Sequence, residues 1–125
     1  MNTFVWIVQI LVALVFLAAG AMKLVQPRKK LAENASMAWT QDFSDAGIKG
    51  IGGLEVLGAL GVILPAATGI ASVLTPIASV GLALTMIGAA VTHLRRHEIQ
   101  AVAAPVILLV LNLVVAWARF GPYAL

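Results

Sequence analysis

Three ionisable side chains, Lys23, Glu55 and His93, occur within or at the ends of long apolar stretches. Glu55 is the most informative of them, because no other charged residue lies between Lys49 and Arg95. A charged side chain at the centre of a membrane helix costs roughly 2.5–3.5 kcal/mol on insertion scales, so it usually has a partner, a water-filled cavity or a function. These residue types could hold the polar group of a ligand, relay a proton, or form an ion pair between helices.

Small residues accompany all three side chains at helical spacing. Three or four positions away, Ala19 and Gly20 precede Lys23, Gly52, Gly58 and Ala59 flank Glu55, and Ala89 and Ala90 precede His93. Residues at these spacings share one helix face, and small residues mark helix–helix contacts in membranes. We therefore expect the three ionisable groups to face protein rather than lipid.

Two interpretations of this cluster remain open. In the first, Lys23, Glu55 and His93 form a polar site that opens to the cytoplasm. In the second, Lys23 and Glu55 form a structural ion pair that locks the first two helices together. His93 has an alternative of its own, as an interfacial residue that lies beside Arg95 and Arg96 and contacts lipid phosphate.

A second polar layer, Gln9, Ser79 and Asn112, falls in the first, third and fourth apolar segments. Hydrogen bonds between helices would account for these residues, since such bonds contribute about 0.6 kcal/mol on average in membranes. The third segment also carries a seam of small residues, which we expect to pack within the monomer, although a homo-oligomer contact would use the same seam. Its members are Ala78, Gly81, Thr85, Gly88 and Thr92.

Composition limits the class of protein. The 125 residues are 62% hydrophobic and 10% charged, whereas soluble domains are about 25% charged. A soluble fold of this size could not bury so much apolar surface, so we expect a membrane protein. The absence of cysteine excludes thiolate catalysis and Cys-ligated metals within this chain. We find no metal-ligand spacing, and a formal charge of +3 in two short clusters suits topology and anionic lipid better than nucleic acid.

Four apolar segments have roughly the 17–25 residues that a helix needs to cross the hydrocarbon core. They predict an all-α fold, a four-transmembrane-helix antiparallel bundle that forms a single membrane domain over residues 1–125. Residues 30–43 mix apolar and charged side chains, so we expect a short amphipathic interfacial helix, with a partly ordered loop as the alternative. Trp39 would lie there at headgroup level and close the inner mouth of the site. The predicted helices cover about 4–25, 48–64, 70–92 and 101–118, and Pro65 closes the second.

Basic residues gather in the first and third connections between helices and are absent from the second. The positive-inside rule then places both basic connections in the cytoplasm and both termini outside. Arg119 is the exception at the other end, and we expect it to snorkel to the interface. The basic residues concerned are Lys23, Arg28, Lys29, Lys30 and Lys49 in the first connection and Arg95 and Arg96 in the third.

Three stretches of the chain carry a family resemblance. Gly20-Ala21-Met22-Lys23-Leu24-Val25-Gln26-Pro27, Ile51-Gly52-Gly53-Leu54-Glu55-Val56-Leu57-Gly58, and Gly81-Leu82-Ala83-Leu84 with Met86-Ile87-Gly88-Ala89 and His93 occur in this order. The first is similar to the G-x-x-K-L-x-x-P ending of the first helix in DoxX-like (DoxX/DoxD) membrane proteins. The second resembles their I-G-x-x-E-x-x-G helix, and the third resembles their third helix. The match spans most of the chain.

The resemblance implies a four-helix protein of the bacterial inner (cytoplasmic) membrane that is not catalytic on its own. Such a protein would bind a small apolar or quinone-like molecule, or serve as the membrane subunit of a larger assembly. Glu55 would be the polar anchor, Lys23 its counter-ion and His93 a gate or second anchor. The alternative is the membrane subunit of a quinone-linked oxidoreductase with soluble redox partners, in which Glu55 and His93 relay a proton. No cofactor ligands are identified, and a quinone is the one cofactor that the resemblance suggests.

Overall fold

The computed structural model describes the backbone of residues 1–125 and all side chains except those of residues 35 and 36. Within this description the protein is all-helical, with four long helices apolar enough to cross a membrane, as the sequence predicts. They are α1 (Asn2–Val25), α3 (Asp45–Thr68), α4 (Leu74–Arg95) and α5 (Ala103–Phe120). The shorter elements are α2 (Arg28–Ala32), the 3-10 helix η1 (Ala35–Asp42) and the 3-10 helix η2 (Ile99–Val102).

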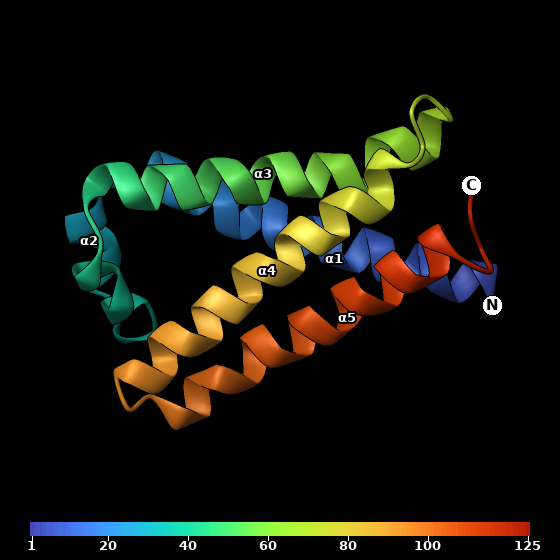
Figure 1. Ribbon diagram of the computed structural model, residues 1–125. Coiled ribbons are helices and arrows are strands. Elements are labelled where there is room, and N and C mark those ends of the chain that lie inside the picture. Colours follow the sequence, from blue (N-terminus) through green and yellow to red (C-terminus); the bar gives the residue numbers. More distant parts are fainter.

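The long helices form two antiparallel pairs, α1 with α3 and α4 with α5 (Figure 1). Contacts of α3 with α4 and of α1 with α5 complete the antiparallel bundle. The pairs lie close together near the chain termini and spread apart toward α2 and η1 (Figure 1). We call the first of these the terminal end. The other is the basic end, which contains the C-terminus of α1, α2, η1 and the turn between α4 and η2.

An apolar core fills the bundle between its middle and the terminal end. Its buried members come from all four long helices: Val8, Val12, Ala13, Phe16, Ala59, Val62, Leu82, Met86 and Val115. On the outer faces, large apolar side chains such as Ile7, Leu57 and Leu84 are exposed. Soluble proteins rarely expose so many large apolar side chains, and this pattern is expected of helices that are surrounded by lipid.

Two glycines set the distance between α1 and α3. A Cβ atom added to Gly20 would lie 2.7 Å from the carbonyl oxygen of Gly52, and one added to Gly52 would lie 2.9 Å from that of Gly20. No Cβ fits at such distances, so the two backbones touch, as they do at small-residue contacts in membranes. Lys23 and Glu55 each lie three residues beyond one of these glycines and therefore extend from the same contact.

The second long helix is longer than the sequence predicts, and Pro65 does not close it. α3 begins at Asp45, after Ser44, whose hydroxyl accepts a hydrogen bond from a backbone N–H of the first turn at 3.0 Å. It ends at Thr68, where Gly69 adopts a left-handed conformation with φ of 73°. The helix continues past Pro65, whose carbonyl accepts a hydrogen bond from the Gly69 N–H at 3.0 Å, and the missing N–H of Pro65 removes one helix bond, to the Gly61 carbonyl. The ends of the other long helices lie within four residues of those predicted.

The connection between α1 and α3 is helical, but it is not the single amphipathic helix expected over residues 30–43. α2 ends at Ala32 and η1 begins at Ala35, because residues 33 and 34 form a turn. The Met37 N–H bonds the Asn34 carbonyl at 2.9 Å, an i+3 bond typical of 3-10 helices. η1 reaches the C-terminal end of α4, where its Asp42 contacts Arg96.

Substituting Gly52→Ala tests the contact between α1 and α3. The added methyl would overlap the Gly20 carbonyl, and overpacking of this kind typically costs about 1–3 kcal/mol. Gly53→Ala is the matched control, because a Cβ atom at Gly53 meets nothing within 4 Å and both variants gain the same helix propensity. We expect thermal unfolding in detergent to show a lower melting temperature for Gly52→Ala alone. Equal melting temperatures would show that the backbones do not touch.

Candidate functional site

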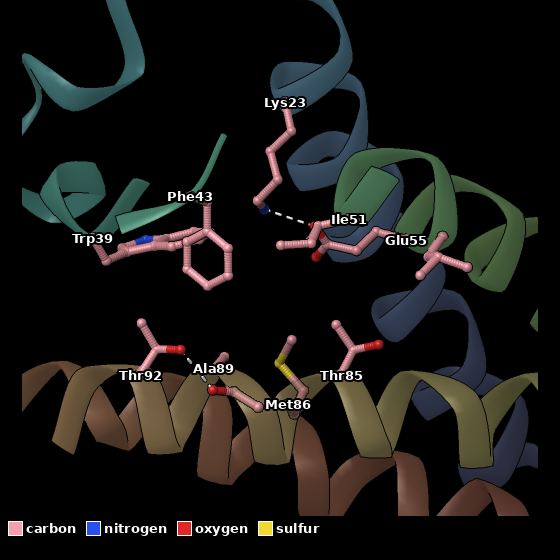
Figure 2. Close-up of a pocket in the computed structure, with 11 residues that line it drawn as sticks. Lys23, Trp39, Phe43, Ile51, Glu55, Thr85, Met86, Ala89 and Thr92 are labelled. Atoms are coloured by element: carbon pink, nitrogen blue, oxygen red, sulfur yellow. Dashed lines mark hydrogen bonds and ion pairs between the residues drawn. The ribbon is translucent and has the colours of Figure 1, made fainter. Parts of the chain in front are cut away.

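A cavity of about 420 Å³ lies at the basic end, between α3 and α4. Figure 2 shows α4 along one side of it, Lys23 of α1 and Glu55 of α3 facing that side, and Trp39 and Phe43 at one end. The divergence of the two helix pairs leaves this space, and its walls are mostly apolar. The other lining residues are Ile51 and Leu54 on α3 and Thr85, Met86, Gly88, Ala89 and Thr92 on α4.

Lys23 and Glu55 form a buried ion pair at the edge of this cavity. Lys23 Nζ lies 2.7 Å from Glu55 Oε1, and the two side chains are 8% and 3% exposed. This contact is an ion pair by distance, but Oε1 has no partner with hydrogen-bond geometry among the described residues. A carboxylate has about four acceptor sites on its two oxygens, so Glu55 retains capacity to accept a hydrogen bond besides its contact with Lys23.

Trp39 of η1 connects the cavity to the end of α4. Its ring centroid is 5.8 Å from Lys23 Nζ, within the range of a cation–π contact. The ring also makes edge-to-face contacts with Phe43 and His93, with centroids 5.6 Å and 6.3 Å apart respectively. Trp39 is partly buried and lies over one end of the cavity (Figure 2).

A chain of ionic contacts, which we call the η1 clamp, holds η1 against the end of α4. His93 Nδ1 lies 2.8 Å from Glu98 Oε1, and Arg96 Nε lies 3.3 Å from Glu98 Oε2. Arg96 also reaches Asp42 of η1, with Nη1 2.9 Å from Oδ1. The hydrogen bond with His93, and then that with Arg96, lowers the pKa of Glu98 below its ordinary value. The neighbouring Arg95 is exposed and takes no part in these contacts.

The structure does not bring His93 into the group formed by Lys23 and Glu55. His93 is 8% exposed, so it faces protein, as its small neighbours predict. Its polar contact, however, is with Glu98, and it is not among the described residues that line the cavity. Its link to the ion pair runs through the Trp39 ring, which contacts both Lys23 and His93.

Lys49 supports the site, although from the sequence it predicts only the orientation of the helices in the membrane. Its ammonium donates hydrogen bonds to the carbonyl oxygens of Lys23 and Leu24, both at 2.9 Å, and of Gln26, at 2.7 Å. The last carbonyls of a helix lack partners within it, and a cation there interacts favourably with the helix dipole. Lys49 thereby fixes α3 to the turn of α1 that carries Lys23. The one sequence signal is that α1 ends before Pro27, which leaves these carbonyls free.

The second polar layer is buried, but its members differ in their hydrogen bonds. Gln9 donates to the Val62 carbonyl on α3 at 3.0 Å and accepts from Arg119 Nε on α5 at 2.6 Å. Asn112 donates within its own helix, to the carbonyl four residues earlier at 2.9 Å, and the Ser79 hydroxyl has no hydrogen bond among the described residues. The prediction of hydrogen bonds between helices is therefore correct for Gln9 and wrong for Asn112 and Ser79. Short polar side chains can bond their own helix backbone, which spacing alone does not reveal.

Arg119 does not snorkel to the interface as the sequence predicts. It is 4% exposed, and its guanidinium bonds Gln9 and Asn2 of α1 inside the bundle. The amide oxygens of these two residues take the place of water, so the side chain reaches acceptors without extending to the membrane surface.

The small-residue seam of α4 is not a packing seam along its whole length. Ala78 packs opposite Gly61, where a Cβ atom added to the glycine would lie 2.8 Å from that of Ala78. At Gly81 and Gly88, an added Cβ atom would meet nothing within 4 Å. The seam residues beyond Gly81 line the cavity instead, because α3 and α4 diverge there. Small residues on this face therefore widen a space rather than close one.

These observations define a class of protein, a multi-pass α-helical membrane protein with an intramembrane ion pair beside a small cavity. The model of the DoxX-like family matches residues 7–115, and the chain belongs to this family. The matched region includes Lys23, Glu55 and His93. No curated protein and no solved structure matches the chain.

A double-mutant cycle on Lys23 and Glu55 measures how far the ion pair stabilises the fold. Lys23→Met leaves a buried carboxylate without its partner, and breaking a buried pair in this way typically costs about 3–5 kcal/mol. Combining it with Glu55→Gln removes the unpaired charge, so we expect the double variant to be more stable than Lys23→Met alone. Unfolding in detergent measures this coupling. Additive effects of the two substitutions would mean that the pair contributes nothing to stability.

The η1 clamp predicts a dependence of stability on pH. The pKa of Glu98 is lower in the folded protein than its ordinary value of 4.5, so its ionised form stabilises the fold above that pH. This contribution is lost as the pH falls through the lowered value. Below about pH 4.5, we expect the melting temperature of the wild type to fall more steeply than that of Glu98→Gln. Parallel curves for the two proteins would contradict a stabilising clamp.

Proposed function

We propose that this protein holds a small, mainly apolar molecule with one polar group in the cavity at the basic end and does not catalyse a reaction on its own. The observation that carries the proposal is Glu55, a buried carboxylate that pairs with Lys23 at 2.7 Å and lines an apolar cavity. Small-molecule sites usually combine apolar walls with a few convergent polar groups, in volumes of about 300–1,000 Å³. The volume of about 420 Å³ lies in this range.

Glu55 and Lys23 offer complementary contacts to the polar group of such a ligand. A hydroxyl or N–H group would donate to the Glu55 carboxylate, whereas a carbonyl oxygen would accept from Lys23 Nζ. A quinone-like molecule presents a carbonyl when oxidised and a hydroxyl when reduced, so this pair suits both of its forms. The rings of Trp39 and Phe43 at one end of the cavity would contact a flat apolar ring.

The bilayer is the proposed source of the ligand. Leu54 of α3 and Gly88 of α4 line the cavity, and both are exposed rather than buried by neighbouring helices. The opening between these helices therefore faces the hydrocarbon region. An apolar molecule dissolved in the membrane would enter sideways without crossing water.

We place the protein in the bacterial inner membrane, with the basic end in the cytoplasm and both termini outside. The exposed Lys29, Lys30 and Arg95 all lie at the basic end, which supports this orientation. Arg119 at the terminal end is buried, so it adds no positive charge to the opposite surface. A ligand-holding subunit of a larger membrane assembly would use the same cavity.

The contacts favour ligand binding over a proton relay between Glu55 and His93. A relay requires a continuous chain of hydrogen-bonding groups or water between donor and acceptor. The Trp39 ring, which contacts His93 and Lys23, lies on the path instead, and His93 Nδ1 is engaged by Glu98 at 2.8 Å. An indole ring offers one donor and no acceptor.

Filling the cavity from α4 tests the proposed binding site. Gly88→Leu adds bulk to the cavity wall, and we expect it to abolish copurification of a defined apolar molecule. Native mass spectrometry in mild detergent, followed by extraction of the bound species, measures this. Gly81→Leu is the matched control, because Gly81 is also open on α4 but does not line the cavity.

Glu55→Gln tests the polar anchor in the same measurement. Loss of a charge-assisted hydrogen bond should weaken binding by about tenfold or more. A wild-type protein that carries no defined small molecule would contradict the proposal. Full occupancy in Gly88→Leu would contradict it equally, because the occupied site would lie elsewhere.

A further inference from the structure

The terminal end of the bundle contains a buried cation without a negative partner. Arg119 lies in the last turn of α5 and is 4% exposed. The chain has five acidic residues, and none of them contacts Arg119 in the described structure: Glu33, Asp42, Asp45, Glu55 and Glu98. An isolated charge in such a position is costly unless something compensates it.

Neutral groups hold the guanidinium in a fixed position. Nε donates to Gln9 Oε1 at 2.6 Å, and Nη1 donates to Asn2 Oδ1 at 2.6 Å and to the Tyr123 carbonyl at 2.9 Å. Its central carbon lies 5.2 Å from the centroid of the Trp6 ring. Nη2 is buried and has no hydrogen-bond partner among the described residues. The Nη2 edge of the guanidinium is therefore held in a fixed orientation but donates no hydrogen bond.

The neighbouring turn of α4 adds further unpaired donors. Gln9 bonds the Val62 carbonyl, and Val62 follows Gly61, which packs on Ala78. Ser79, next to Ala78, therefore lies at the level of the layer that Gln9 and Arg119 form. Its hydroxyl is buried without a hydrogen bond in the described part of the structure, as is that of Thr75 one turn nearer the terminal end.

A cavity of about 200 Å³ gives access to this region. Arg119 lines it together with Ser72 and Val73, which precede α4, and with the segment that follows α5. α4 is 22 residues long, and its first turn has neither an acidic residue nor a side-chain cap. The N–H groups of Leu74, Thr75 and Ile77 bond backbone carbonyls, so this end of α4 contributes its dipole but few free donors.

We propose that Arg119 binds a phosphate-type oxyanion at the terminal end of the bundle, independently of the ligand at the basic end. In this structure the Tyr123 carbonyl accepts a hydrogen bond from Nη1. When the segment from Gly121 to Leu125 moves aside, Nη2 would donate to the anion. A guanidinium fork matches the geometry of phosphate oxygens. Two sources share this chemistry, the headgroup of an anionic phospholipid and free phosphate. α5 ends at Phe120, one residue beyond Arg119, which places the site near headgroup depth.

Trp6 provides a local probe of anion binding, since the guanidinium stacks on it. In a Trp39→Phe, Trp117→Phe background, we would titrate dioctanoylphosphatidylglycerol, dioctanoylglycerol and inorganic phosphate into the detergent-solubilised protein. We expect a saturable change in Trp6 fluorescence with dioctanoylphosphatidylglycerol and none with dioctanoylglycerol, which has the same acyl chains without phosphate. Native mass spectrometry of bound lipid gives a readout that does not depend on Trp6.

Two variants test the role of Arg119. Arg119→Gln should weaken phosphate-dependent binding by about tenfold or more, because it removes a charge-assisted hydrogen bond. Arg119→Lys keeps the charge but loses the fork, so we expect weaker binding than in the wild type, and it serves if Arg119→Gln does not fold. Saturable binding of inorganic phosphate as well as lipid would identify a soluble anion, and binding of the phospholipid alone would identify a headgroup. No saturable response to either, or equal binding by wild type and Arg119→Lys, would overturn the proposal.

Discussion

The ion pair between Lys23 and Glu55 is the interaction on which the basic end of the bundle depends. It forms where Gly20 and Gly52 allow the backbones of α1 and α3 to touch, so its position follows from a steric contact. Lys49 fixes the same turn of α1 from the side of α3. Together these contacts hold a carboxylate at a depth where an unpaired one would be unstable, and they orient it along the edge of the cavity.

The two ends of the bundle accommodate intramembrane charge in different ways. At the basic end, Glu55 and Lys23 compensate each other beside an open cavity, and the η1 clamp holds Trp39 over it. At the terminal end, Arg119 bonds neutral acceptors such as Gln9 and forms no ion pair with an acidic side chain in the described part of the chain. The apolar core around Phe16 separates the two regions. We therefore propose two separate sites, one for an apolar molecule with a polar group and another for an anion.

The sequence predicts features that depend on local patterns, such as the helices. It does not predict contacts that depend on residues far away along the chain. Hydropathy gives the helices, and the small neighbours of Lys23 and Glu55 correctly place both side chains inside. The same reasoning misjudges the α4 seam, because small residues suit a cavity wall as well as a helix contact. Burial of Arg119 depends on acceptors from α1, 110 residues away along the chain in the case of Gln9. The contacts of Lys49 likewise require knowing which helix turn lies opposite.

The most direct test of this account is the ionisation state of Glu55 in the membrane. Infrared spectra of protein labelled with 13C at the glutamate carboxyl groups, reconstituted in lipid, would be compared with those of Glu55→Gln. The account predicts that the substitution removes carboxylate bands and that Lys23→Met shifts those same bands in the otherwise unchanged protein. Loss of a protonated carboxyl band instead, insensitive to Lys23→Met, would contradict an ionised Glu55 held by Lys23.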